Sequence, residues 1–133
     1  MQVNNIVFPG GSADLSAVSE ADQAANRRVL GQVGRALNRY GGYSITIEGH
    51  SNPINAPGTP ERAAEESADQ ALSLQRAQAV LDFLATDNGN NNVNRDSMTA
   101  IGKSCSQPVV EVGSDDYDEE SSRNRRVEFI LNK

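Results

Sequence analysis

The 133-residue chain contains no tryptophan, one cysteine at Cys105 and one histidine at His50. A single cysteine cannot form an internal disulfide, and no spacing of cysteines and histidines matches a zinc site. We expect Cys105 to be a small packing residue. Ser51 follows His50, but no catalytic motif surrounds the pair, so we expect a structural, hydrogen-bonding histidine. The sequence therefore predicts a protein that has no metal ligands and needs no cofactor, and that is not an enzyme.

Long apolar runs and an excess of basic residues are also missing. No segment is apolar over the length needed to span a bilayer, and the first residues lack the charged and hydrophobic regions of a signal peptide. We expect any membrane contact to come from segments outside this chain. The net charge of −6 and the pI near 4.7 argue against nucleic acid as a partner, because phosphate binding needs clustered Lys and Arg.

The length fits one domain, and we assign residues 1–133 to a single unit. Hydrophobic patterning predicts a strand over residues 3–8, followed by a turn at Pro9. A helix is predicted whose beginning Ser19 and Asp22 can cap; its apolar residues follow at helical spacing, and it ends at Gly41. The next residues alternate between apolar and polar side chains from Tyr43, which predicts a second strand with one buried face. That strand carries residues 49–52 to its end.

The second half of the chain begins with residues 53–67, which are rich in Pro, Gly and charged side chains. We predict an inserted loop there that can hold a helical turn near residues 61–66. A second helix carries Leu72 and later apolar residues, and strands follow at residues 98–102 and 127–131. The order of these elements predicts an α+β fold, a two-layer sandwich with two main helices on one face of a mixed sheet.

Residues 113–122 contain a run of carboxylates between Asp115 and Glu120. Clustered oxygen ligands suit hard cations such as calcium, but this spacing does not match a calcium-binding EF-hand loop and lacks its central glycine. We therefore predict a solvated acidic loop.

Three segments carry a resemblance to a known family: IEGHSN at residues 47–52, LSLQRA at residues 72–77 and NRRVEFIL at residues 124–131. They resemble the GHTD, N-x-x-LS-x-x-RA and NRRVE motifs of the peptidoglycan-binding domain of the OmpA, Pal and MotB type. Phe8 and the small residues after it also match the opening of that domain. The resemblance implies the same two-layer architecture and a non-catalytic binding function.

The family's ligand clamp implies the central site residues. In the family, the arginine that corresponds to Arg76 binds the carboxylate of a diamino acid, usually meso-diaminopimelate, in the peptidoglycan stem peptide. The aspartate of GHTD holds the ammonium group, and this position is Asn52 here, which makes the chain a divergent member. Asp69 stands where the family usually has asparagine, so we hypothesise that acid and amide have exchanged places. The alternative is that Asp69 only complements the helix dipole.

Four further residues complete the predicted site. The resemblance places Arg125 near the ligand or its supporting residues, although both arginines of this segment can instead neutralise nearby acids. Leu72 and Ser51 belong to the matching motifs, and Phe8 belongs to the loop that, by the resemblance, borders the ligand-binding groove. Phe8 can equally serve only to close the core.

The function implied is non-covalent binding of the peptidoglycan stem peptide, which tethers an envelope protein to the cell wall. We expect a periplasmic domain of a larger outer-membrane or lipid-anchored protein. The main alternative keeps the fold but has lost wall binding, and serves as a structural or protein-interaction module. A hydrolase using Glu48 and His50 is disfavoured on the expectation that these two strand residues face opposite sides.

Overall fold

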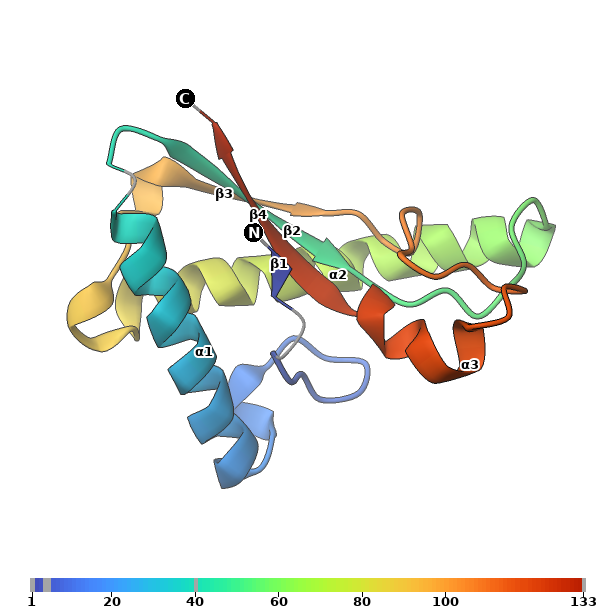
Figure 1. The fold of residues 1–133 in the computed structure, drawn as a ribbon, viewed down its shortest axis with the longest axis horizontal. Coiled ribbons are helices and arrows are strands. Elements are labelled where there is room, and N and C mark those ends of the chain that lie inside the picture. The colour runs from blue at the N-terminus through green and yellow to red at the C-terminus, as the bar shows by residue number, and fades with distance from the viewer. Residues whose placement is uncertain (1, 4–5, 40, 133) are drawn as a thin grey trace.

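The computed structural model describes residues 2–3, 6–39 and 41–132, and a mixed four-stranded sheet runs through it (Figure 1). The strands are β1 (Gln2–Val3), β2 (Ser44–His50), β3 (Met98–Gly102) and β4 (Arg126–Asn132), in the order β1-β4-β2-β3. β2 pairs in parallel with β3 and antiparallel with β4. The predicted mixed sheet is therefore confirmed.

The first strand is shorter than the residues 3–8 predicted from the sequence. Residues 4 and 5 lie outside the described part of the chain, and residues 6–8 form no strand. The backbone of Val7 pairs instead with a helix side chain, because its N–H donates to Asn26 Oδ1 at 2.8 Å and its carbonyl accepts from Asn26 Nδ2 at 2.9 Å. A buried asparagine thus takes both hydrogen bonds that a strand neighbour would have made.

Two long helices accompany the sheet. α1 (Glu20–Asn38) begins at the predicted cap Ser19, whose hydroxyl accepts from the N–H of Asp22. α2 (Pro60–Thr86) is capped by Thr59 and has proline in its first turn, where a missing N–H costs nothing. The predicted loop at residues 53–67 is therefore confined to residues 53–59, and the remainder forms the first two turns of α2.

Short helical turns occupy several connections. They are η1 (Leu15–Ala17), η2 (Gly89–Asn91), η3 (Arg95–Ser97), α3 (Tyr117–Glu120) and η4 (Ser121–Asn124). α3 and the first half of η4 fall inside residues 113–122, so the segment predicted as an acidic loop is partly helical. No helix among the described residues is both long and apolar enough to cross a membrane.

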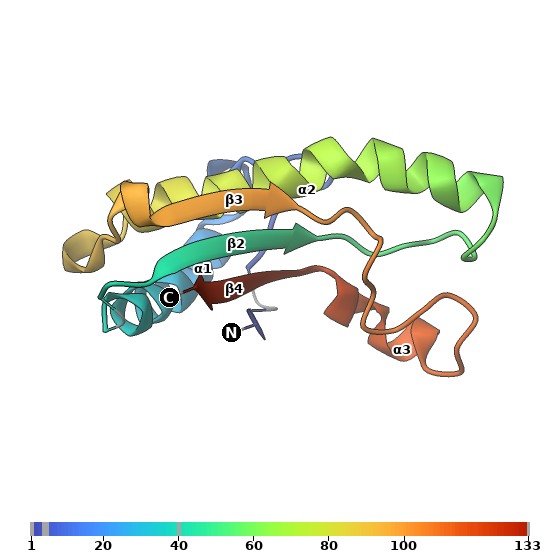
Figure 2. The same cartoon turned by 90° about the horizontal axis from the view of Figure 1, so that it is seen from above.

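Both long helices pack on the same face of the sheet. One hydrophobic core joins residues of α1 such as Leu30 and residues of α2 such as Val80 to Ile47 and Phe129 on the central strands. Successive strand residues face opposite sides, so the side chains of β2 and β4 that lie between these core positions point away from the helices. The predicted two-layer α+β arrangement is confirmed (Figure 2).

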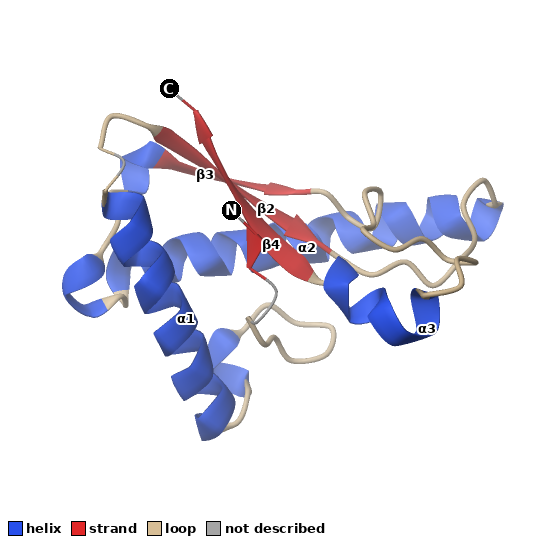
Figure 3. Cartoon of the chain, in the orientation of Figure 1, coloured by secondary structure: helices blue, strands red, loops and turns tan. Residues whose placement is uncertain are grey.

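Two glycines let α2 approach the strands closely. A Cβ at Gly49 would collide with the backbone carbonyl of Ser73, and one at Gly102 would lie 2.6 Å from Ser73 Oγ. Ser73 Oγ also accepts a hydrogen bond from the N–H of Ser104 at 3.0 Å. These contacts fix the middle of α2 against the ends of β2 and β3, where the loops gather (Figure 3).

Candidate functional site

Arg76 lies half-buried on α2, and its guanidinium is held by the first loop, residues 6–14. Nε donates to the carbonyl of Ser12 at 3.2 Å, and one terminal nitrogen, Nη2, donates to the carbonyl of Pro9 at 3.1 Å. The charged group stacks over the ring of Phe8 with its central carbon 5.1 Å from the ring centroid. Phe8 also packs against the hydrophobic core. These three contacts orient the guanidinium.

Asp69 reaches the loop that follows β2. Ser51 Oγ donates to Asp69 Oδ2 at 3.1 Å, although the two residues come from different elements. Asp69, Leu72 and Arg76 share one face of α2, because residues three, four and seven apart line up along a helix. The rise along the helix axis from Asp69 to Arg76 is about 10 Å, and the long arginine side chain can span part of this distance.

The pKa of Arg76 reports the charges around it. Burial lowers this pKa, the negative charge of Asp69 raises it, and the positive charge of Arg125 lowers it further. The guanidinium nevertheless stays protonated at any physiological pH. The negative charge of Asp69 and the positive charge of Arg125 therefore both act on the Arg76 guanidinium.

Asn52 is engaged at both ends of its side-chain amide. Its Oδ1 accepts from Asn124 Nδ2 at 2.8 Å, and its Nδ2 donates to the hydroxyl of Tyr117 at 3.1 Å. That hydroxyl donates in turn to the carbonyl of Pro53. These contacts form a chain of hydrogen bonds whose direction is fixed at Asn124, because Asn124 Oδ1 already accepts from the N–H groups of Val109 and Val110.

The remaining two residues of the predicted site are Leu72 and Arg125. Leu72 is half-buried one turn before Arg76, and Arg125 is exposed immediately before β4. Among the described residues, neither side chain shows a polar contact with Asn52 or Asp69. The structure therefore brings together Phe8, Ser12 and Arg76 in one group, and Ser51 with Asp69 in another.

Sequence reasoning missed Tyr117, which lies in the acidic run, and did not assign Asn124 a contact with Asn52. Tyr117 is the aromatic residue of a segment otherwise made of carboxylates, serines and glycine, and that contrast was the available signal.

Arg62 was missed by sequence reasoning as well. It is 5% exposed, donates to Glu111 through two nitrogens at 2.8 and 3.1 Å and lies 3.5 Å from Glu66. This pair ties the beginning of α2 to the loop after β3.

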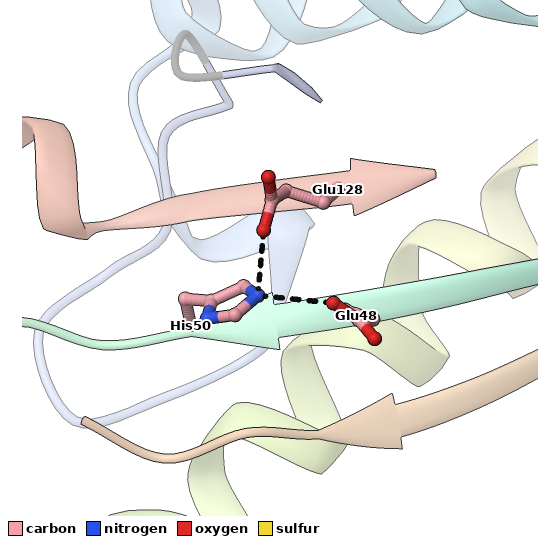
Figure 4. Close-up of side chains that lie close together, drawn as sticks. All are labelled: Glu48, His50 and Glu128. Atoms are coloured by element: carbon pink, nitrogen blue, oxygen red, sulfur yellow. Dashed lines mark hydrogen bonds and ion pairs between the residues drawn. The ribbon is translucent and has the colours of Figure 1, made fainter. Parts of the chain in front are cut away.

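The opposite face of the sheet carries a second polar cluster. His50 Nε2 lies 3.0 Å from Glu128 Oε2 and 3.3 Å from Glu48 Oε1, so both carboxylates point at one ring nitrogen (Figure 4). The expectation that Glu48 and His50 face opposite sides is wrong, because residues two positions apart on a strand share a face. Burial lowers the pKa of His50, the charge of Arg126 lowers it further, and the two carboxylates oppose this.

The fold and the first group of residues define a class: a two-layer α+β domain whose longest helix presents an arginine and an aspartate beside loops from the strand ends. A model of the OmpA family matches residues 7–125. The chain belongs to the OmpA family, and the predicted family membership is confirmed.

Sequence relatives agree with this assignment. The peptidoglycan-associated lipoproteins of Brucella melitensis and Brucella suis are each 34% identical over 110 residues, which make up 83% of this chain and 56% of theirs. The chain thus spans little more than half the length of these relatives.

Solved structures show the same fold. The cell wall anchor of the T6SS from Pseudomonas aeruginosa is 27% identical with a TM-score of 0.63, covering 98% of this chain and 78% of that one. The peptidoglycan-associated lipoprotein from Burkholderia pseudomallei is 21% identical with a TM-score of 0.62, covering 98% and 89% respectively. At that identity the second likeness concerns the fold alone.

Proposed function

We propose that this domain binds the diamino acid of the peptidoglycan stem peptide without catalysing a reaction, and thereby tethers an envelope protein to the cell wall. The observation that carries the proposal is the pair of opposite charges, Asp69 and Arg76, on one face of α2. A ligand with an amine and an acid needs both signs within one site. The names of the relatives, peptidoglycan-associated lipoproteins and a cell wall anchor, support the choice of ligand.

Arg76 binds the ligand carboxylate in this proposal. Nε and Nη2 already donate to the first loop, and among the described residues Nη1 has no hydrogen-bond partner. A guanidinium fixed in this way loses little conformational entropy on binding, and a charge-assisted hydrogen bond to a carboxylate is among the strong ones. Arg125 adds a second positive charge on the same side, and Leu72 offers apolar contact one turn away.

Asp69 binds the ammonium group in place of the aspartate that the family has at position 52. Ser51 donates to one carboxylate oxygen and leaves the other for the ligand. Asn52 cannot neutralise an ammonium, and its amide is occupied by Asn124 and Tyr117. The exchange of acid and amide thus keeps a negative charge in the site and moves it from the loop to the helix.

The location follows from the ligand. A domain that binds peptidoglycan works in the periplasm, and the names of the lipoprotein relatives support a place in an outer-membrane or lipid-anchored protein.

Co-sedimentation with insoluble peptidoglycan tests the proposal. The parent and the variants Asp69→Asn and Arg76→Lys are mixed with walls that contain diaminopimelate and with walls that contain lysine. Asp69→Asn preserves shape and the contact with Ser51, so a loss of binding of about ten- to a hundredfold reports the missing charge. Arg76→Lys keeps the charge but loses the planar fork, and the same direction of change is expected.

Glu61→Gln is the matched control, since it removes one carboxylate from the first turn of the same helix, outside the site. It should bind like the parent. Equal binding by Asp69→Asn and the parent would reject the exchange of acid and amide. A parent that stays soluble with both walls would reject wall binding altogether and leave the protein-interaction module as the function of this fold.

A further inference from the structure

The helix-free face of the sheet holds two carboxylates directly opposite each other. Glu48 and Glu128 are register partners in the antiparallel pair of β2 and β4, and both side chains point away from the helices. Like charges at such positions repel and destabilise a sheet unless a cation lies between them. The histidine next along β2, His50, turns its Nε2 into the space that the two carboxylates share (Figure 4).

We propose that Glu48, His50 and Glu128 form a binding site for a divalent transition-metal ion, with Zn²⁺ as the best fit. One nitrogen and two oxygens, all within 4.8 Å of one another, supply the three ligand atoms. Zinc takes imidazole nitrogen and carboxylate oxygen at about 2.0–2.2 Å, so its tetrahedral ligands lie about 3.3–3.5 Å apart. The observed separations of 3.0 and 3.3 Å from Nε2 need only a small expansion.

The three side chains are well held for this purpose. The His50 side chain is 1% exposed and that of Glu48 is 11% exposed, whereas Glu128 at 31% leaves a path from solvent. All three come from two hydrogen-bonded strands, which hold ligands more rigidly than loops do. Three protein ligands leave one position of a tetrahedral ion for water or for an outside group.

Two cations now balance the carboxylates and would compete with a metal. Arg126 Nη2 lies 3.2 Å from Glu128 Oε2, and Lys103 Nζ lies 3.9 Å from Glu48 Oε2. Arg126 also donates to the carbonyls of Asn124 and Gln107, so it remains held when Glu128 turns toward an ion. Lys103 is a third exposed and can swing into solvent. Removal of its charge should therefore strengthen metal binding.

A second group, Glu65, Asp69 and Cys105, also has ligand atoms within 4.8 Å of one another. Its carboxylates already have donors, since Glu65 accepts from the N–H groups of Ile54 and Asn55 and Asp69 accepts from Ser51. Cys105 is completely buried. This group lies at the proposed wall-binding site and serves as the competing location in the test.

Calorimetric titration of Zn²⁺ into the full chain, freed of metal by a chelator and carrying no polyhistidine tag, tests the proposal. One ion should bind per chain, and excess zinc should raise the thermal unfolding midpoint. Glu128→Gln should weaken binding at least tenfold, and Lys103→Gln should tighten it. Co²⁺ in place of Zn²⁺ should give the visible absorption of a nitrogen- and oxygen-liganded ion, and Glu128→Gln should abolish it.

Glu119→Gln removes one carboxylate from an exposed part of the acidic segment and should bind zinc like the parent, as should Cys105→Ser. Glu48→Gln provides a second ligand variant if Glu128→Gln folds poorly. The proposal is overturned if the parent binds no stoichiometric zinc, or if Cys105→Ser loses binding while Glu128→Gln keeps it. None of these readouts depends on peptidoglycan, so the zinc site and the wall-binding function stand or fall separately.

Discussion

The side-chain amides of Asn52 and Asn124 face each other, with Asn124 Nδ2 donating to Asn52 Oδ1 at 2.8 Å. The contact sets the direction of a short hydrogen-bond chain. Asn52 must donate to Tyr117, because the tyrosine hydroxyl already donates its own proton to the carbonyl of Pro53. A carboxylate at position 52 has no proton to donate, so this hydrogen-bond chain needs the amide that replaces the family's aspartate.

Asn52→Asp should therefore destabilise the protein rather than restore a family site. The carboxylate and the carbonyl of Pro53 would compete for the one proton of the Tyr117 hydroxyl, and one buried acceptor would lose its partner. We expect the free energy of unfolding to fall by about 1–2 kcal/mol in urea denaturation.

A double-mutant cycle with Tyr117→Phe checks the mechanism. Without the hydroxyl there is nothing to compete for, so the cost of Asn52→Asp should shrink by at least about 0.5 kcal/mol in that background. Equal costs in both backgrounds would show that the tyrosine does not set the requirement for an amide.

Ser51→Ala should weaken wall binding more than it weakens the fold. The hydroxyl orients the carboxylate of Asp69, whereas the N–H of Ser51 keeps its hydrogen bond to the carbonyl of Ser104 at 2.8 Å. We expect about a tenfold loss in peptidoglycan co-sedimentation. Ser114→Ala removes an exposed hydroxyl that donates only to a local carbonyl, and unchanged binding is expected there.

Acidic pH should weaken the interaction of Arg62 on α2 with Glu111 in the loop after β3. The hydrogen bonds from Arg62 hold the pKa of Glu111 below its usual range. A lowered carboxyl pKa contributes stability above the ordinary value of about 4.3, and that contribution disappears as the pH falls through the folded-state pKa.

Glu111→Gln tests this linkage. At neutral pH it should lower the free energy of unfolding by about 1 kcal/mol, since the pair is partly exposed and screened. Between pH 6 and pH 3 the stability of the variant should fall less steeply than that of the parent. Parallel curves would assign the acid sensitivity to other groups.

Gly49→Ala should be among the most damaging single changes. The added Cβ meets the backbone carbonyl of Ser73, which cannot yield unless α2 moves away from β2. We expect a loss of about 1–3 kcal/mol of stability by thermal or urea unfolding. Gly41→Ala is the matched control, because nothing lies within 4 Å of a Cβ at that position and its conformation is not left-handed.

Most of the fold was predictable because its signals are local. Apolar spacing located α1, β2, β3 and β4, and the cap at Ser19 located the beginning of α1. The early start of α2 was also predictable in principle, since a threonine followed by a proline is a strong helix-start signal. Its charged and mostly exposed first turns lacked the apolar spacing on which the prediction relied.

The site was predictable only where the motifs themselves carry it. The contact of Ser51 with Asp69 fits the proposed exchange, but the hold of Arg76 by Pro9 and Ser12 joins residues more than sixty positions apart and has no sequence signal. The contact of Glu128 with His50 has no sequence signal either, because it depends on the register of β2 and β4. Nor does a sequence show that Val7 pairs with Asn26 instead of a neighbouring strand.

The hydrogen bonds from Arg76 to the first loop also join two regions into one thermodynamic unit. Surface loops are ordinarily the first segments to open, but opening this one must release the guanidinium to which we assign the ligand. Coupling between two such events is reciprocal. A bound wall fragment should therefore slow amide hydrogen exchange in the first loop by the same factor by which an open loop weakens binding, which makes that loop a reporter of occupancy.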